Sequence, residues 1–181
     1  TLTHLYYFVG IDAVREIDET VNRYKGTEEV SVFHGRDLFA YTAAKLAAGV
    51  IDFEGVGPEY PVEDIIVYPK KLIIAEIGGD SAKGIVSSVS DPFGSIVFNI
   101  SVKDFVKAGF QHGDMVHVLL THNGETVFDQ EVLYHKSFGF VPEGEPIIFN
   151  SSSTYVSLGL NMDSFRDKHG IGAGAEWEVT L

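Results

Sequence analysis

The segment GIVSSVSDPFGSIVFNI, residues 84–100, shows the pattern from which we predict the fold of this chain. Its two ends are short apolar runs typical of β-strands, at residues 84–89 and 95–100, and the Asp-Pro-Phe-Gly sequence between them is typical of a turn. From about residue 64 the same period-two pattern recurs between turn residues, which predicts a small barrel or sandwich. Further strands are expected at residues 72–77, 115–121, 127–134, 147–150, 155–160 and 175–181, with helices at 102–108 and 162–168.

Residues 1–62 have a different pattern, in which helix and strand are mixed. Short strands are predicted at residues 13–17 and 30–33, and the apolar run at residues 5–9 fits either a helical turn or a strand. This part of the chain therefore predicts an α/β portion.

A helix is predicted after the second of these strands. Asp37 is its predicted N-cap, because a carboxylate accepts hydrogen bonds from the free N–H groups of a first turn, and Gly49 ends the helix. Residues 52–63 hold two glycines and two prolines and predict a linker. The predicted fold is an incomplete α/β N-terminal portion, residues 1–62, followed by an all-β barrel domain, residues 63–181.

The composition limits the function classes. The 181 residues carry a formal charge of −13, because 26 acidic residues stand against 13 basic ones. Such a surface repels phosphate backbones, so no nucleic-acid partner is expected, whereas a cationic small ligand is compatible with it. No apolar run reaches the roughly 18 residues of a membrane span, so no membrane partner is expected. The expected location of the protein is the cytoplasm. The chain has no cysteine and its histidines lack metal-ligand spacing, so no metal site is expected.

The first candidate site is the run His34-Gly35-Arg36-Asp37, between a predicted strand and the predicted helix. Such a junction exposes its residues at the edge where open α/β folds bind ligands. Gly35 permits a close approach to the backbone, and the imidazole of His34 can hold or deprotonate a water molecule. The alternative is structural, with Arg36 and Asp37 as a local ion pair and His34 as a half-buried turn residue.

Two more candidates lie in the predicted β-domain. Asp91 and Phe93 would present a carboxylate and an aromatic ring on one rim, where the carboxylate can bind an ammonium group; the alternative is a plain hairpin turn. The hydroxyl cluster at residues 149–155 suits a carboxylate or a nucleobase edge, although polar loops of this kind are common. Phe138 and Phe140 can stack on a flat ring or pack in a core.

Five motifs follow one another along the chain: Val-Phe-His-Gly-Arg-Asp at 32–37, Asp-Pro-Phe-Gly at 91–94, Asn-Ile at 99–100, Pro-Glu-Gly-Glu-Pro at 142–146 and Asn-Ser at 150–151. Taken in this order, they resemble the S-adenosyl-L-methionine (SAM) hydrolase family, the SAM hydroxide adenosyltransferases, which are relatives of the nucleoside fluorinase and chlorinase. The resemblance covers nearly all of the chain. It implies an α/β N-terminal domain, a C-terminal β-barrel and a homotrimer that binds SAM at a subunit interface. It also implies that water attacks the ribose C5′ and expels methionine, which gives adenosine without a cofactor.

Carried over by position, His34 matches the histidine of the family's water-holding Asp–Arg–His triad and is the expected catalytic residue. The halogenases carry Tyr in place of His34, and the fluorinase has Ser in place of Gly35, so this pair favours hydrolysis over halogenation. The expected substrate-binding residues are Phe33 and Gly35 beside the ribose, Asp91 for the methionine ammonium, Phe93 and Phe138 on the adenine faces, Ser95, Leu160 and Met162 at the adenine edge, and Ser151 and Ser152 for the methionine carboxylate, with Asn150 in the same motif.

The chain departs from the family pattern. The Asp and Arg of the triad belong to a glycine-rich segment expected before residue 1, so we expect this chain to be the C-terminal part of a longer protein and not to hydrolyse SAM alone. Ser95 stands where the family usually has Asn. Two alternative functions stay open: a halide-dependent 5′-halo-adenosine synthase, and a non-catalytic β-domain that binds adenosine or SAM.

Overall fold

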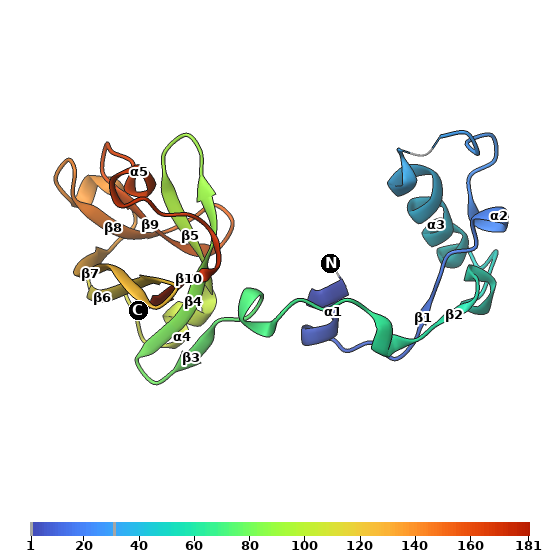
Figure 1. Ribbon diagram of the computed structural model, residues 1–181, viewed down its shortest axis with the longest axis horizontal. Coiled ribbons are helices and arrows are strands. Elements are labelled where there is room, and N and C mark those ends of the chain that lie inside the picture. Colours follow the sequence, from blue (N-terminus) through green and yellow to red (C-terminus); the bar gives the residue numbers. More distant parts are fainter. Residues whose placement is uncertain (1, 31) are drawn as a thin grey trace. The chain divides into compact units, whose positions relative to one another are not determined.

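The computed structural model describes residues 2–30 and 32–181 (Figure 1). The chain forms two compact units, Thr1–Val67 and Tyr68–Leu181. The boundary predicted from the sequence, after residue 62, lies inside the first of these units. Within the described part of the chain, every helix is too short or too polar to traverse a lipid bilayer.

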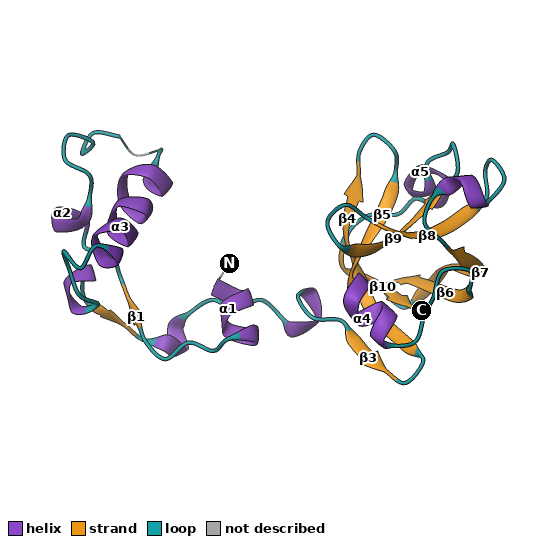
Figure 2. Ribbon diagram, turned by 180° about the vertical axis from the view of Figure 1, so that it is seen from behind, coloured by secondary structure: helices purple, strands orange, loops and turns teal. Residues whose placement is uncertain are grey.

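The second unit is a closed β-barrel, whose strands curve around a common interior (Figure 2). The strand order is β10-β6-β7-β8-β9-β5-β4-β3, and an additional pairing of β10 with β4 closes a ring of seven strands. The predicted β-barrel is therefore confirmed. The strands are β3 (Glu76–Gly78), β4 (Ser81–Ser90), β5 (Ser95–Ser101), β6 (Met115–His122), β7 (Glu125–Tyr134), β8 (Pro146–Asn150), β9 (Tyr155–Leu160) and β10 (Gly174–Thr180).

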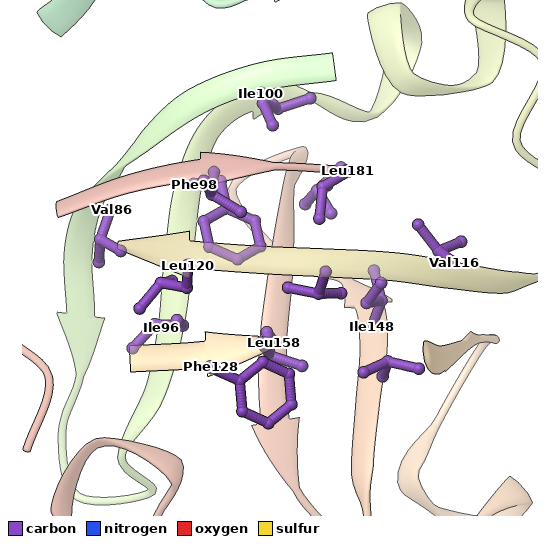
Figure 3. Packing of buried hydrophobic residues seen from close by; sticks show 14 of the residues in the cluster. Val86, Ile96, Phe98, Ile100, Val116, Leu120, Phe128, Ile148, Leu158 and Leu181 are labelled. Carbon is purple, nitrogen blue, oxygen red and sulfur yellow. The ribbon is translucent and has the colours of Figure 1, made fainter. Parts of the chain in front are cut away.

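The barrel interior is filled by side chains at alternate positions of its strands. Ile96, Phe98 and Ile100 of β5 are fully buried, whereas Val97 between them faces the other side of the sheet. Figure 3 shows Phe98 and Leu158 gathered with other apolar side chains between the strands. Burying a side chain of this size stabilises a fold by about 1.5–3 kcal/mol, so this cluster is the main source of stability in the unit.

Two short helices interrupt the strands of the barrel, α4 (Val102–Lys107) and α5 (Phe165–His169). Each follows a serine whose hydroxyl accepts a hydrogen bond from a backbone N–H in the first turn, Ser101 for α4 and Ser164 for α5. Such caps satisfy N–H groups that the helix itself leaves unpaired. Both helices were predicted, and α5 begins a few residues later than the predicted range of 162–168.

The first unit consists of short elements. Its two strands pair with each other, Val14 with Tyr60 and Arg15 with Glu59, so the segment predicted as a linker contributes a strand to the unit. The α/β N-terminal domain stays a prediction. The elements are α1 (Leu2–Phe8), β1 (Val14–Arg15), α2 (Glu19–Asn22), the π-helix η1 (Gly35–Ala40), α3 (Tyr41–Ala47), the 3-10 helices η2 (Glu54–Val56) and η3 (Val62–Asp64), and β2 (Glu59–Tyr60).

Three local predictions are wrong. Val30, Val32 and Phe33 were expected in a strand but lie in bends and irregular structure; Ser31, from the same predicted strand, lies outside the described residues. Val32 and Phe33 are 77% and 54% exposed, so their β-forming side chains lack the packing that a strand needs.

The other two errors concern helices. Asp37 is not an N-cap, because η1 begins at Gly35 and the carboxylate of Asp37 pairs with the guanidinium of Arg36. The strand predicted at 72–77 begins only at Glu76, because Leu72 ends the 3-10 helix η4 (Lys70–Leu72) and residues 73–75 lie in a turn and irregular structure.

Candidate functional site

A pocket of about 830 Å³ lies on the outer face of the barrel. Its floor is a row of cross-strand neighbours: Ser88 of β4 pairs with Val97 of β5, Val97 with Ser157 of β9, and Ser157 with Phe149 of β8. Cross-strand partners point to the same side of a sheet, so these four side chains share one surface. The remaining lining residues are Ser90, Pro92, Phe93, Ser95, Phe138, Ser151, Ser152, Ser153, Leu160, Asn161, Met162, Asp163 and Ser164.

Aromatic rings line this pocket. Phe138, in the short 3-10 helix η5 (Phe138–Phe140), packs against Phe149 with ring centroids 4.8 Å apart and an angle of 54° between the rings. Phe93 is 73% exposed in the turn between β4 and β5. Large exposed aromatic rings beside a hollow provide faces on which a flat ligand can stack.

Gly159 of β9 leaves the space that two pocket residues occupy. A Cβ atom at this position would come within 2.5 Å of the Ser95 hydroxyl oxygen and within 3.2 Å of an aromatic carbon of Phe138. Any larger side chain here would therefore displace both neighbours. The shape of the pocket depends on this glycine.

The turn at residues 91–94 is attached to α5. The backbone N–H of Arg166 donates to the Gly94 carbonyl at 2.9 Å, and Nη1 of the same residue donates to Oδ1 of Asp91 at 2.5 Å. Nε of Arg166 donates to Oδ1 of Asp167 at 3.0 Å. The hydrogen bonds to Asp167 and Asp91 raise the pKa of the Arg166 guanidinium, so it stays charged. The Asp91 carboxylate, expected to bind an ammonium group, thus already has one cationic partner.

The polar loop after β8 is organised by its own hydrogen bonds. The backbone N–H of Ser151 donates to the Tyr155 carbonyl at 2.9 Å, and the hydroxyls of Ser151 and Ser153 lie 2.7 Å apart. Asn150 is turned to a different partner, because its Oδ1 accepts a hydrogen bond of 2.9 Å from the hydroxyl of Tyr134. Burial raises the pKa of that Tyr134 phenol, which keeps it protonated as the donor.

His34 and its neighbours belong to the first unit. The imidazole lies edge-to-face against the Phe39 ring, with centroids 6.4 Å apart. Nε and Nη2 of Arg36 donate to the two carboxylate oxygens of Asp37 at 2.5 and 2.7 Å, and these bonds hold the pKa of Asp37 below its usual range. The Arg36 guanidinium also lies over the Phe33 ring, 4.8 Å from its centroid. A Cβ on Gly35 would meet no atom within 4 Å, so nothing in its own unit requires the small residue.

The pocket brings together seven of the nine substrate-binding residues that were predicted in the β-domain. Asp91 lies next to the lining residue Pro92, and Asn150 pairs with Tyr134 instead. Phe33, His34 and Gly35 are in the other unit, and their roles stay predictions. The seven are Phe93, Ser95, Phe138, Ser151, Ser152, Leu160 and Met162.

Sequence reasoning missed Arg166 and three of the four floor residues, Ser88, Val97 and Ser157. Ser157 is only 1% exposed, and its hydroxyl has no hydrogen-bond partner within the described part of the chain. The alternation of residues in the predicted strand at 155–160 indicates that Ser157 faces outward. The sequence does not give the register of this strand against β5 and β8, so it could not show which residues lie beside Ser157. No group of His, Asp or Glu side chains among residues 2–30 and 32–181 has the arrangement of a metal site.

A comparison with protein families matches the unit that contains the pocket. Residues 88–178 match the family model described as the SAM hydroxide adenosyltransferase C-terminal domain. An (R)-S-adenosyl-L-methionine hydrolase of Thermus thermophilus is 31% identical over 147 residues, which cover 80% of this chain and 47% of that protein. A fluorinase of Actinopolyspora mzabensis is 28% identical over 149 residues, which cover 82% of this chain and 48% of that protein. The chain thus spans about half the length of these curated relatives.

A solved structure has a similar fold. The crystal structure of an uncharacterized conserved protein from Thermotoga maritima superposes with a TM-score of 0.68 at 26% sequence identity. The alignment covers 99% of this chain and 64% of the other.

Proposed function

Because this chain belongs to the SAM hydroxide adenosyltransferase family, we propose that it acts in the hydrolysis of SAM to adenosine and L-methionine. The observation that carries this proposal is the pocket on the barrel, where aromatic rings and serine hydroxyls predicted to bind SAM line one cavity of about 830 Å³. Two curated relatives carry the name (R)-S-adenosyl-L-methionine hydrolase, which agrees with a substrate of this class.

In the proposed reaction a water oxygen forms a bond to the ribose C5′ as the bond from C5′ to sulfur breaks. The electron pair of that bond stays on sulfur, so methionine leaves as a neutral thioether and needs no acid to protonate it. The proton lost by the water passes to the His34 imidazole and then to solvent. The protein's task is to orient one water molecule in line with the leaving sulfur and to exclude others.

Halide attack on the same carbon is the second candidate. The relatives named fluorinase are 28% and 27% identical to this chain, close to the 31% of the hydrolase. The presence of His34-Gly35, where the halogenases differ, favours water as the nucleophile. A third candidate is a barrel that binds adenosine or SAM without chemistry.

Isotope labelling separates these three functions. The intact gene product would be incubated with SAM in chloride-free buffer containing ¹⁸O-labelled water, and the nucleoside analysed by mass spectrometry. We expect adenosine that carries ¹⁸O at its 5′-oxygen. A nucleoside product that forms only after fluoride or chloride is added, and that contains the halogen, would show that the reaction is halogenation and not hydrolysis. Binding of SAM without any turnover would favour the third function, a barrel that binds SAM without chemistry.

Gly159→Ala is expected to weaken adenosine binding by about tenfold or more, because the new Cβ overpacks the pocket against Ser95 and Phe138. The affinity would be measured by calorimetry. The matched control is Gly78→Ala in β3, where a Cβ meets no atom within 4 Å. Equal affinities for the two variants would contradict the assignment of this pocket to adenosine.

The proposal includes a homotrimer with SAM bound at a subunit interface, as the family resemblance implies. Symmetric assemblies in which neighbours share a site are common among soluble enzymes. Light scattering of the intact gene product should give three times the mass of one chain, and the mass of a single chain would exclude this arrangement.

A further inference from the structure

The rim of the pocket at residues 91–94 is held against α5 by three contacts. The Gly94 carbonyl accepts a backbone hydrogen bond from Arg166, and the Asp91 carboxylate accepts one from the guanidinium. Gly94 also lies directly against Ser164, since a Cβ on Gly94 would come 1.9 Å from the Ser164 hydroxyl oxygen. The backbone contacts fix the path of the turn, whereas the guanidinium fixes only the direction of the Asp91 side chain.

The charges around this rim favour a cationic ligand. The Arg166 guanidinium forms ion pairs with both Asp91 and Asp167. Among the described residues that line the pocket, Asp163 is the one with an ionisable side chain. Two carboxylates, Asp91 and Asp167, thus share one guanidinium, and the charge of Asp91 is only partly neutralised by its ion pair. The side chain of Asp91 is 72% exposed, so the carboxylate oxygen that Arg166 does not hold is open to a ligand.

We propose that Arg166 is a positioning residue for the amino-acid end of the ligand: it holds the Asp91 carboxylate at the rim so that its second oxygen accepts the α-ammonium group of SAM. This inference rests on the proposed function, which supplies the ligand. A lysine cannot take over this task, because a single ammonium lacks the rigid fork with which Arg166 reaches Asp91 and Asp167 together.

The test compares two ligands that differ at the amino-acid end. SAM carries the α-ammonium, and 5′-methylthioadenosine has the same nucleoside and a sulfur but lacks the amino-acid part. Arg166→Lys in the intact gene product keeps the local charge and removes the fork. We expect it to weaken SAM binding by about fivefold, the scale of a partly exposed ion pair, and to leave 5′-methylthioadenosine binding unchanged. Lys168→Arg, on the same helix, is the matched control and should change neither affinity.

A double-mutant cycle with Asp91→Asn separates positioning from a general structural role. If Arg166 acts through Asp91, Arg166→Lys should weaken SAM binding no further once Asp91 is replaced. Equal weakening of both ligands by Arg166→Lys, or an additive effect in the cycle, would overturn the proposal. Tighter SAM binding would also overturn it, because Arg166 would then be a competitor of the ammonium. SAM that fails to bind the unaltered protein would overturn the proposed function itself.

Discussion

Replacing His34 by alanine should lower SAM turnover by the intact gene product about 10²–10⁴-fold, the usual contribution of a side chain that positions or deprotonates a water. The affinity for SAM should change little, because the aromatic rings and hydroxyls of the barrel pocket are untouched. Turnover is measured from adenosine release and affinity by calorimetry. This separation of rate from binding is the mark of a group that acts on the nucleophile.

The matched control for His34→Ala is His117→Ala. His117 is an exposed histidine on β6, 57% exposed, whose Nε2 lies 2.7 Å from Oδ1 of Asp129. Its loss should leave turnover as it is. If the two histidine variants turned over SAM equally fast, His34 would have no part in the reaction, and its contact with the Phe39 ring would be its whole role.

Phe98→Ala should destabilise the barrel by about 3–5 kcal/mol, the typical loss for a large aromatic side chain removed from a core. Phe98 is fully buried on β5, and the strands around it cannot close the space without breaking their pairing. A domain of this size has about 5–15 kcal/mol of total stability, so the variant should unfold at much lower urea concentration.

Phe93→Ala serves as the control for Phe98→Ala, because it removes the same side chain from a position that is 73% exposed. It should change the free energy of unfolding by less than about 1 kcal/mol. A similar urea midpoint for both variants would mean that Phe98 does not lie in the barrel core in solution.

The barrel could be predicted from the sequence, because a half-buried strand records its two faces in alternate residues. At β5 the buried Ile96, Phe98 and Ile100 carry this signal. The error at residues 30–33 has the opposite cause. Val32 and Phe33 favour strands by composition, but a strand also needs a neighbour to pair with, and single-sequence patterns do not report the neighbour.

Residues of the candidate site could be predicted from the sequence only where they belong to a motif of the family. Phe93 and Phe138 were identified in that way and line the pocket. Ser157 was not, because its position depends on the register of β9 against β5 and β8. Arg166 was missed because its partner Asp91 lies 75 residues earlier in the chain. Asp37 was assigned as a helix cap from its position, but the adjacent guanidinium of Arg36 is the stronger partner for a carboxylate.

The pairing that closes the ring has a consequence for the order of events during protein synthesis. β10 joins β4 to β6, for example through Val179, which pairs with Gly84 and with Leu120. A ribosome adds about 5–20 residues per second, so several seconds pass between the emergence of β6 and that of β10. Until β10 is made, the edges of β4 and β6 lack the strand that joins them, and unpaired strand edges are templates for pairing with other chains. Completion of the barrel is therefore a late event, and the incomplete barrel is the species that a holding chaperone would have to protect.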